Sequence, residues 1–297
     1  MSESEIDAGS VPVYVVVSPA RDEAEYLPYT MRSMVAQTWR PAKWVIVNDG
    51  STDGTGEIAR EFAADHDWIE VIDRRDRGSR RPGGGVVEAF SEGFALMDGI
   101  DWEFAVKLDS DLDLPEDYFE RCLQRMIDEP ELGIAGGMIE NDIDGKLVLE
   151  EHPMFHVRGA TKIYRRSCWD AIGGIHAVKG WDTLDELKAA LNGYTTRSFR
   201  DIILIQRRFT GDGQGQWPNW QKNGEAAYVC GYHPAFVLAK AVRRCFIRPW
   251  VIAGAGLVVG YCKAVINRRE RVDDPELLAY VREQQWRRLT GRSSAWR

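Results

Sequence analysis

Short apolar runs alternate with amphipathic segments over the first half of the chain. The runs are rich in β-branched and aromatic residues, which is typical of strands buried on both faces. They lie at 13–17, 44–47, 68–72 and 104–108. The segments between them carry apolar residues at helical spacing, for example Leu27, Met31 and Met34. This alternation predicts an α/β fold with a doubly wound, mostly parallel sheet.

Each predicted strand is followed by a polar or glycine-rich loop, and such loops meet at one edge of a doubly wound sheet. They lie at 18–23, 48–55, 74–85 and 109–113. The loop after the first strand has no GxGxxG, which argues against a nucleotide-dependent dehydrogenase. It also lacks the Gly-rich Lys/Arg signature of a pyrophosphorylase, and no GxxxxGK[ST] indicates a P-loop.

The loop after the fourth predicted strand is acidic, with Asp109, Asp111 and Asp113 within five residues. Carboxylates this close repel one another unless a cation lies between them. A hard divalent cation, Mg²⁺ or Mn²⁺, prefers such oxygen ligands, so Asp109 and Asp111 form a candidate metal site. The alternative is a solvated turn that caps the helix expected from Pro115, and we assign that role to Asp113.

Three motifs, SPARDE at 18–23, NDGSTDGT at 48–55 and LDSD at 108–111, resemble in order and spacing the GT-A-fold glycosyltransferases of family 2. This resemblance implies a Rossmann-like GT-A domain that binds a nucleotide-diphosphate sugar. It also implies a Mg²⁺ or Mn²⁺ ion that Asp109 and Asp111 hold against the two phosphates. A GT-A-like binding or scaffold module without turnover is the alternative, but such a module needs no acid pair.

The resemblance further implies which residues bind the nucleotide. They are Ser18, Pro19, Arg21, Glu23, Asp49, Arg80, Arg81 and Asp109. An ionised carboxylate only accepts hydrogen bonds, which suits Glu23 and Asp49 to a base N–H or a ribose hydroxyl. A turn that bonds its own backbone is the alternative for Asp49. The basic, glycine-rich loop with Arg80 and Arg81 is suited to the diphosphate, or is simply a surface loop.

In the family, the catalytic base precedes a helix that ends in Gly-Tyr, and the segment 180–194 matches that frame. Counting back from Gly193 puts Asp182 on the aspartate of the family's Glu-Asp pair, with Trp181 in place of the glutamate. Asp185 is the second candidate. One base that deprotonates the acceptor hydroxyl opposite the leaving diphosphate gives inversion. Asp182 can also cap the helix that follows.

The composition excludes some classes of protein. A net charge of −8 argues against nucleic-acid binding. Five scattered cysteines without metal-ligand spacing fit a reducing, cytoplasmic location. Residues 1–10 are acidic and polar, unlike a signal peptide, and we expect a disordered leader there. Residues 11–215 then form the GT-A domain, with a nucleotide-binding half at 11–113 and an acceptor half at 114–215.

The remaining segment, 216–297, is expected to be a helical extension in which the charge balance reverses toward Lys and Arg. Its most apolar run, VIAGAGLVVGYC at 251–262, is shorter than the ~18 residues of a spanning helix and has basic flanks. This pattern predicts peripheral contact with an anionic membrane through 240–271, and a buried helix hairpin is the alternative. Membrane contact would suit a polyprenyl-linked or other glycan acceptor at the cytoplasmic face. A processive synthase needs several spanning helices, which the sequence lacks.

Overall fold

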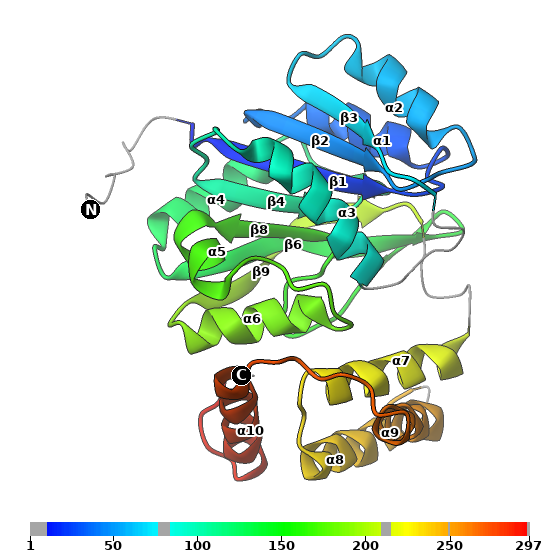
Figure 1. The fold of residues 1–297 in the computed structure, drawn as a ribbon, viewed down its shortest axis with the longest axis vertical. Coiled ribbons are helices and arrows are strands. Elements are labelled where there is room, and N and C mark those ends of the chain that lie inside the picture. The colour runs from blue at the N-terminus through cyan, green and yellow to red at the C-terminus, as the bar shows by residue number, and fades with distance from the viewer. Residues whose placement is uncertain (1–10, 77–83, 209–214, 249, 296–297) are drawn as a thin grey trace.

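The computed structural model describes residues 11–76, 84–208, 215–248 and 250–295. Its centre is a nine-stranded sheet of order β3-β2-β1-β4-β8-β6-β9-β5, with β7 paired to β6 (Figure 1). The strands are β1 (Tyr14–Ala20), β2 (Lys43–Asn48), β3 (Ile69–Asp73), β4 (Phe104–Leu108), β5 (Leu112–Asp113), β6 (Leu132–Ile143), β7 (Lys146–Leu149), β8 (Thr161–Arg165) and β9 (Thr195–Gln206). Strands β3, β2, β1 and β4 are parallel, and β8 joins them antiparallel to β4.

Helices connect the strands and cover both faces of the sheet, which confirms the predicted α/β fold. They are α1 (Leu27–Val35), α2 (Thr55–Ala63), α3 (Gly84–Phe94), the 3₁₀ turn η1 (Ala95–Met97), α4 (Tyr118–Asp128), α5 (Arg166–Ile172) and α6 (Trp181–Leu191). Because the first four strands are parallel, their carboxyl ends bring the loops after β1, β2 and β4 to one edge.

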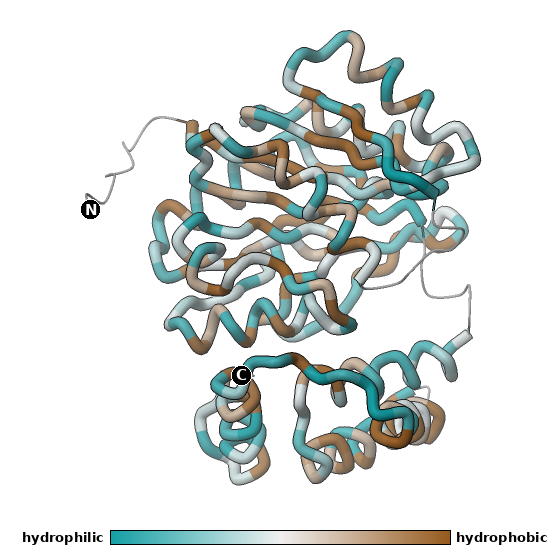
Figure 2. The backbone as a smooth tube through the Cα atoms, viewed as in Figure 1, coloured by the Kyte–Doolittle hydropathy of each residue, from teal (hydrophilic) through white to brown (hydrophobic). Residues whose placement is uncertain are grey.

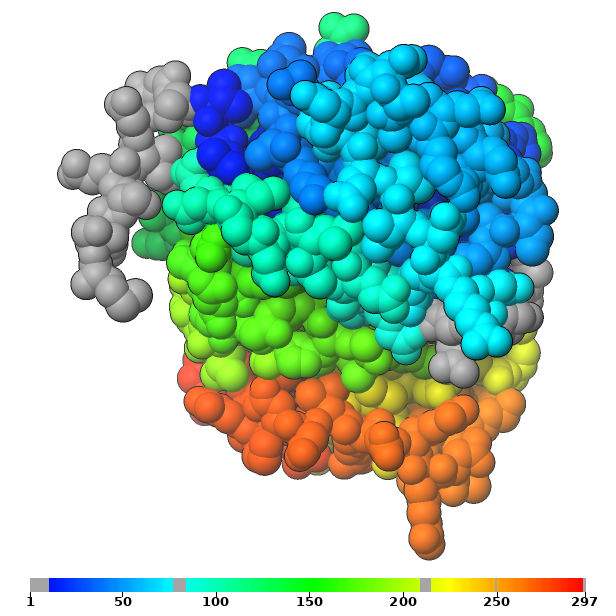
Figure 3. Space-filling view, turned by 45° about the horizontal axis from the view of Figure 1, so that its top comes forward, coloured from blue at the N-terminus to red at the C-terminus, as the bar shows by residue number. Residues whose placement is uncertain are grey.

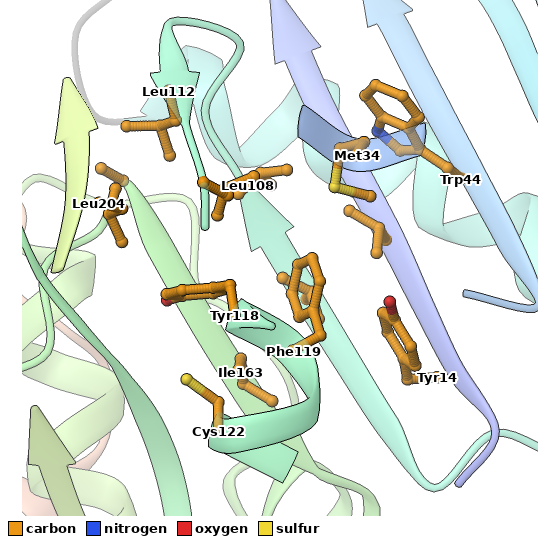
Figure 4. Packing of buried hydrophobic residues seen from close by; sticks show 14 of the residues in the cluster. Tyr14, Met34, Trp44, Leu108, Leu112, Tyr118, Phe119, Cys122, Ile163 and Leu204 are labelled. Atoms are coloured by element: carbon orange, nitrogen blue, oxygen red, sulfur yellow. The ribbon is translucent and has the colours of Figure 1, made fainter. Parts of the chain in front are cut away.

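The alternating side chains of the strands build two hydrophobic layers, one on each face of the sheet. On one face Tyr14 and Leu108 pack with Met34 of α1 and with Tyr118 and Phe119 of α4 (Figure 4). The opposite face packs against α3 and the segment after it. Both layers are fully buried near the acidic loop after β4, so that loop extends from a rigid core.

Four helices form a separate layer below α6 in Figure 1. They are α7 (Gln216–Val229), α8 (Pro234–Cys245), α9 (Val251–Ile266) and α10 (Pro275–Leu289). Their shared core includes Leu257, Tyr261 and Leu277, and it is continuous with Leu184 and Leu187 of α6. In the space-filling view these C-terminal residues, yellow through orange to red, cover the end of the molecule next to the green residues of the sheet domain (Figure 3). No helix among the described residues is long and apolar enough to cross a membrane.

One local expectation is wrong. Asp113 does not cap the next helix: it lies in β5 and pairs with Arg207, and α4 begins only at Tyr118. In the C-terminal layer, α7 ends at Val229 and α8 begins at Pro234. Proline has no backbone N–H to continue a helix but fits its first turn, and so α8 starts there.

Candidate active site

The turn after β1 buries Glu23 and directs its carboxylate toward the end of β9. Arg208 Nη2 lies 2.5 Å from Glu23 Oε1, and the Glu23 backbone N–H donates to Thr55 Oγ1 at 2.8 Å. The preceding residue, Asp22, has φ 53°, in the left-handed region that reverses the chain sharply. The predicted nucleoside acid is therefore a buried group on a tight turn, held by a cation from a distant strand.

The other predicted residues of this loop connect it to its neighbours. Ser18 is buried, and its Oγ accepts from the Trp44 indole N–H at 2.9 Å. The carbonyl oxygen of Pro19 accepts from Ser110 Oγ at 3.2 Å, and Arg21 Nη1 donates to the carbonyl oxygen of Asp49 at 2.8 Å. These hydrogen bonds join the loops after β1, β2 and β4 into one structure.

Asp49, directly after β2, faces an arginine that the sequence did not single out. Arg74 Nη1 lies 2.7 Å from Asp49 Oδ1, and both side chains are largely buried. Arg74 Nε also pairs with Glu92 of α3 at 2.8 Å. The pair places one cation and one anion beside the end of β2. Arg80 and Arg81, predicted for the diphosphate, lie outside the described residues.

Asp109 projects from the end of β4 and stays partly exposed, with 31% of its side chain accessible. Its Oδ1 pairs with Lys107, which is itself buried and also donates to the Gly159 carbonyl oxygen at 2.6 Å. Its backbone N–H donates to the Ala160 carbonyl oxygen at 2.7 Å. Asp109 is thus held on a fixed backbone beside a buried ammonium group.

Asp111 is the opposite case, a carboxylate buried at the bottom of the site. Its Oδ2 accepts from Gln206 Nε2 at 3.1 Å and lies 3.7 Å from Arg208 Nε. Its Oδ1 is buried without a hydrogen-bond partner among the described residues. Burial, and then the charge of Asp109, raise the pKa of Asp111 to about 6. An orphaned, buried carboxylate oxygen next to a second carboxylate fits a site for a cation.

The donor set determines which metal would fit. Among the described residues no cluster of three or more His, Cys, Asp or Glu side chains could hold a metal by itself. Mg²⁺ and Mn²⁺ do not require one, because such ions are often held by one or two carboxylates together with substrate phosphates and water. The pair Asp109 and Asp111 therefore fits a metal that binds with a diphosphate and does not fit a closed structural metal site.

Asp182 lies in the first turn of α6 and is half-buried. Lys162 holds this turn by donating to the Asp182 carbonyl oxygen. A Cβ on Gly159 would lie 3.4 Å from the Asp182 Cβ, and the Gly159 carbonyl oxygen binds Lys107, the partner of Asp109. The backbone at Gly159 thus brings the predicted base and the acidic loop to the same side of the sheet.

Asp185 lies one turn further along α6 in a different environment. It is 1% exposed, and its Oδ1 and Oδ2 lie 2.8 and 3.0 Å from Lys162 Nζ. The hydroxyl of Tyr164 donates to it at 2.5 Å, and Glu186 pairs with the same lysine at 3.1 Å. Burial raises the pKa of Asp185 to about 6, although the charge of Lys162 opposes the change. The structure therefore encloses Asp185 in an ion cluster beneath the first turn of α6.

Two site residues missed in the sequence lie at the end of β9 and just after it. Gln206 and Arg208 contact Asp111, and Arg208 also contacts Glu23, so the end of β9 connects the two predicted halves of the donor site. In the sequence, only the polar run Gln206-Arg207-Arg208 after an apolar stretch points to these two residues. That run can be interpreted as part of the site only if 195–206 is first identified as a strand.

The chain matches the family model "Glycosyl transferase family 2" over residues 15–178. Among curated proteins it is 26% identical over 195 residues to glycosyltransferase GlyA of Streptococcus pneumoniae, a match that covers 65% of this chain and 25% of GlyA. It is 29% identical over 94 residues to glycosyltransferase AglE of Haloferax volcanii, covering 30% of this chain and 31% of AglE. These matches thus cover a quarter to a third of each relative.

Solved structures share the fold at low sequence identity. The mannosyltransferase PcManGT from Pyrobaculum calidifontis, in complex with GDP-Man and Mn²⁺, superposes with a TM-score of 0.60 at 15% identity, covering 88% of this chain and 89% of that one. GalNAc-T7 with UDP, GalNAc and Mn²⁺ gives a TM-score of 0.59 at 10% identity, covering 80% of this chain and 51% of that one.

Proposed function

The chain belongs to glycosyl transferase family 2 and is a glycosyltransferase with the GT-A fold, and from this premise we propose a metal-dependent, inverting transfer from a nucleotide-diphosphate sugar to an acceptor hydroxyl. The observation that carries the proposal is the pairing of a buried, orphaned carboxylate, Asp111, with a partly exposed one, Asp109, beside a half-buried candidate base. We assign residues 11–215 to the transfer reaction and 216–297 to attachment.

In this proposal the donor binds along the edge formed by the loops after β1, β2 and β4. Glu23 and Asp49 accept hydrogen bonds from the nucleoside, since ionised carboxylates act only as acceptors. Asp109 and Asp111 would hold Mg²⁺ or Mn²⁺, which would supply positive charge to the departing diphosphate. Arg208 already lies between Glu23 and Asp111 and adds a second positive group at that position.

Asp182 is the proposed general base. It takes the proton of the acceptor hydroxyl while the acceptor oxygen forms a bond to the anomeric carbon of the sugar. The bond from that carbon to the diphosphate oxygen breaks on the opposite face, and the electron pair leaves with the diphosphate, which gives inversion. Its carboxylate is half-buried on the first turn of α6, so it can meet an acceptor from solvent, whereas Asp185 is enclosed by Lys162 and Tyr164.

Hydrolysis of nucleotide sugars tests this function without knowledge of the acceptor. UDP-, GDP- and dTDP-sugars are incubated with the protein and Mn²⁺, and release of the nucleoside diphosphate is measured. We expect release with at least one donor, loss of release with a chelator, and loss in Asp111→Asn. Release that continues unchanged with chelator contradicts metal dependence. If no donor releases its nucleoside diphosphate, whether or not a donor binds, the result supports the inactive GT-A-like module.

We also propose that the C-terminal layer docks on an anionic membrane at the cytoplasmic face. The α8–α9 face is defined here by the exposed apolar side chains Leu238, Val242, Phe246, Trp250, Val251, Ile252, Val265 and Ile266. Spacing of four residues puts Leu238, Val242 and Phe246 on one side of α8. Hydrophobic residues are visible on α8 and α9 in Figure 2.

Charge complementarity favours a lipid surface as the occupant of the α8–α9 face. Basic residues surround the apolar ones on both sides, at Arg243, Arg248, Arg268, Arg269 and Arg271. An apolar face with basic flanks is typical of helices that lie in the interface of an anionic bilayer. Docking there would give the site access to a lipid-linked acceptor.

A further inference from the structure

A cavity of about 340 Å³ lies between α7, α9 and the segment that leads into α6. Four of the described residues that line it are basic, namely Lys179, Lys222, Lys263 and Arg269, and Glu225 is the acid among them. None of these residues belongs to the donor site described above. The cavity therefore presents an excess of positive charge at a place that the transfer mechanism does not explain.

Polar contacts hold three of the cations at the cavity wall. Glu225 of α7 pairs with Lys179 at 2.7 Å and with Arg269 at 3.2 Å, and so brings these two side chains to one carboxylate. Lys263 of α9 donates to Gln221 Oε1 of α7 at 2.9 Å. Lys179, Lys263 and Arg269 carry three positive charges against the one carboxylate of Glu225. Phosphate oxygens are the ligands that clustered Lys and Arg groups bind best.

The position of Lys179 relates the cavity to the proposed base. Lys179 precedes Asp182 by three residues, and three residues of chain span at most about 10 Å. The intervening Gly180 packs on α7, where its Cβ would lie 3.2 Å from the Ala226 Cβ, so this short segment is fixed against the cavity wall. The backbones of the cavity residue Lys179 and of the proposed base are therefore close neighbours.

The other end of the cavity borders the α8–α9 face. Lys263 and Ala264 line the cavity, and the next two residues of α9, Val265 and Ile266, are exposed members of that face. Three features therefore follow one another across the molecule, namely the apolar α8–α9 face, the basic cavity and the candidate base Asp182. A lipid phosphate that carries a sugar has its hydrocarbon chain, its phosphate and its hydroxyl groups in the same order.

We propose that this cavity is a phosphate subsite for the acceptor, and that the acceptor is a lipid-linked phosphate or diphosphate. The phosphate binds among Lys179, Lys263 and Arg269, the lipid chain extends along the α8–α9 face, and the attached hydroxyl group reaches Asp182. This inference rests on the proposed function, because only a transfer reaction at Asp182 requires an acceptor there.

The test measures the binding of inorganic pyrophosphate and of farnesyl diphosphate by calorimetry, in EDTA, with the full chain. Variants are Lys263→Glu/Arg269→Glu, the neutral pair Lys263→Gln/Arg269→Gln, and the matched control Arg288→Glu/Arg292→Glu, whose arginines are exposed outside the cavity. We expect the wild type and the control to bind pyrophosphate, and the charge-reversed pair to bind at least tenfold more weakly. Charge reversal beside Glu225 can impair folding, and the melting temperature of each variant reports this. In that case the neutral pair, Lys263→Gln/Arg269→Gln, tests the proposal in its place.

The two probes distinguish the sources of the phosphate. Farnesyl diphosphate that binds more tightly than pyrophosphate, and loses this binding in the cavity variants, supports a lipid-linked acceptor. Equal binding of both probes overturns the lipid assignment, and binding that the cavity variants leave unchanged overturns the subsite. Donor hydrolysis with Mn²⁺ separates this inference from the proposed function: hydrolysis should persist in the cavity variants, and its absence in the wild type would refute the proposed function instead.

Discussion

The ionised carboxylate of Asp111 lowers the stability of the fold. Burial and the nearby charge of Asp109 raise its pKa to about 6, and one of its oxygens has no hydrogen-bond partner among the described residues. A carboxyl group whose pKa is higher in the folded state than in the unfolded one destabilises the fold at pH values above it. Groups of this kind are concentrated at functional sites, where a ligand requires the charge.

We therefore expect Asp111→Asn to stabilise the metal-free protein while it impairs donor turnover. At pH 7.5 in EDTA the free energy of unfolding should rise by ~1–3 kcal/mol, because the buried charge is removed. The gain should shrink as the pH falls from 6 toward 4, where the folded wild type takes up a proton that the unfolded chain does not yet bind. Urea denaturation at both pH values measures this. Asp109→Asn, at a partly exposed position, is the comparison and should give a smaller gain, because it removes only the repulsion from Asp109 and leaves Asp111 buried; a loss of stability in Asp111→Asn at pH 7.5 contradicts the prediction.

Two aspartates on α6 offer a matched comparison at the same scale. Asp182→Asn should lower kcat for transfer by ~10²–10⁴-fold, because a general base contributes about that much, and should leave the donor Kd within about twofold. Asp185→Asn should instead lower the free energy of unfolding by ~3 kcal/mol, since it leaves the buried charge of Lys162 short of a partner. Kinetics and urea denaturation of both variants measure these effects. Normal turnover in Asp182→Asn, together with loss in a stably folded Asp185→Asn, would transfer the role to Asp185.

At the scale of elements, loops that follow continuous apolar strands were predictable and those that follow β9 were not. Glu23, Asp49, Asp109 and Asp111 each lie within three residues of the end of a buried strand, so sequence periodicity places them at the same sheet edge. Strand β9 is interrupted by Arg200 and Asp201, and its pairing with β6 shifts register there. Asp201 bonds Arg121 and Arg125 of α4, so its polar character reflects a distant helix.

The contacts that complete the site depend on the same distant pairing. Gln206 reaches Asp111 because β9 pairs with both β6 and β5, an arrangement that no local pattern in 195–206 encodes. The ion pairs of Lys107 and Lys162 also depend on the tertiary structure. These lysines are cross-strand partners in β4 and β8. Lys107 pairs with Asp109 in the loop after β4, and Lys162 pairs with Asp185 of α6. Sequence periodicity placed the acids at one sheet edge and the family resemblance singled out Glu23 and Asp49, whereas only tertiary pairing identifies the cations that hold these acids.

Glycines determine how the helices of the C-terminal layer pack. Gly256 and Gly260 of α9 face α7, where a Cβ would lie 2.7 Å from the Trp220 Cβ and from the Gln221 carbonyl carbon, respectively. Gly224 of α7 faces the backbone of α9 in the same way. Small residues four apart let two helix backbones approach closely, which explains the glycine content of the run 251–262.

Gly260→Ala should therefore destabilise the C-terminal layer. The added methyl group meets backbone atoms of Gln221, which cannot rotate away, so we expect a loss of ~1–3 kcal/mol or more in unfolding free energy. Cys262→Ala, at an exposed position of the same helix, is the control and should change stability by less than ~0.5 kcal/mol. Limited proteolysis after residue 215 and chemical denaturation measure the effect. Equal stability of both variants would show that α7 and α9 are not tightly packed at this point.

At the scale of the whole molecule, the C-terminal layer joins the sheet domain through one continuous core and leaves its outer side apolar. Leu184 and Leu187 of α6 belong to the same hydrophobic cluster as Leu257 and Tyr261 of α9, so the helix that carries Asp182 is also part of the C-terminal core. Docking of the outer side would therefore fix the orientation of the site relative to the surface. A shared core of this kind favours a rigid connection over a flexible tether.

Membrane docking through the α8–α9 face predicts sedimentation with vesicles of equal parts phosphatidylglycerol and phosphatidylcholine at low salt. Phe246 and Ile266 are 76% and 77% exposed, and burial of a side chain of this size in lipid contributes ~1.5–3 kcal/mol. Phe246→Glu/Ile266→Glu should thus reduce the bound fraction at least tenfold. High salt should weaken binding of the wild type, because it screens the surrounding arginines from the anionic lipid.

The control for this test is Leu147→Glu/Val148→Glu, which changes two exposed apolar residues of β7 outside the C-terminal layer. It should bind vesicles like the wild type, because the loss must be specific to the α8–α9 face and not to apolar surface in general. A wild type that stays in the supernatant at low salt contradicts membrane docking. If the wild type is a dimer in gel filtration and Phe246→Glu/Ile266→Glu makes it a monomer, the α8–α9 face instead binds a second copy of the chain. An apolar face can be covered by the same face of another copy.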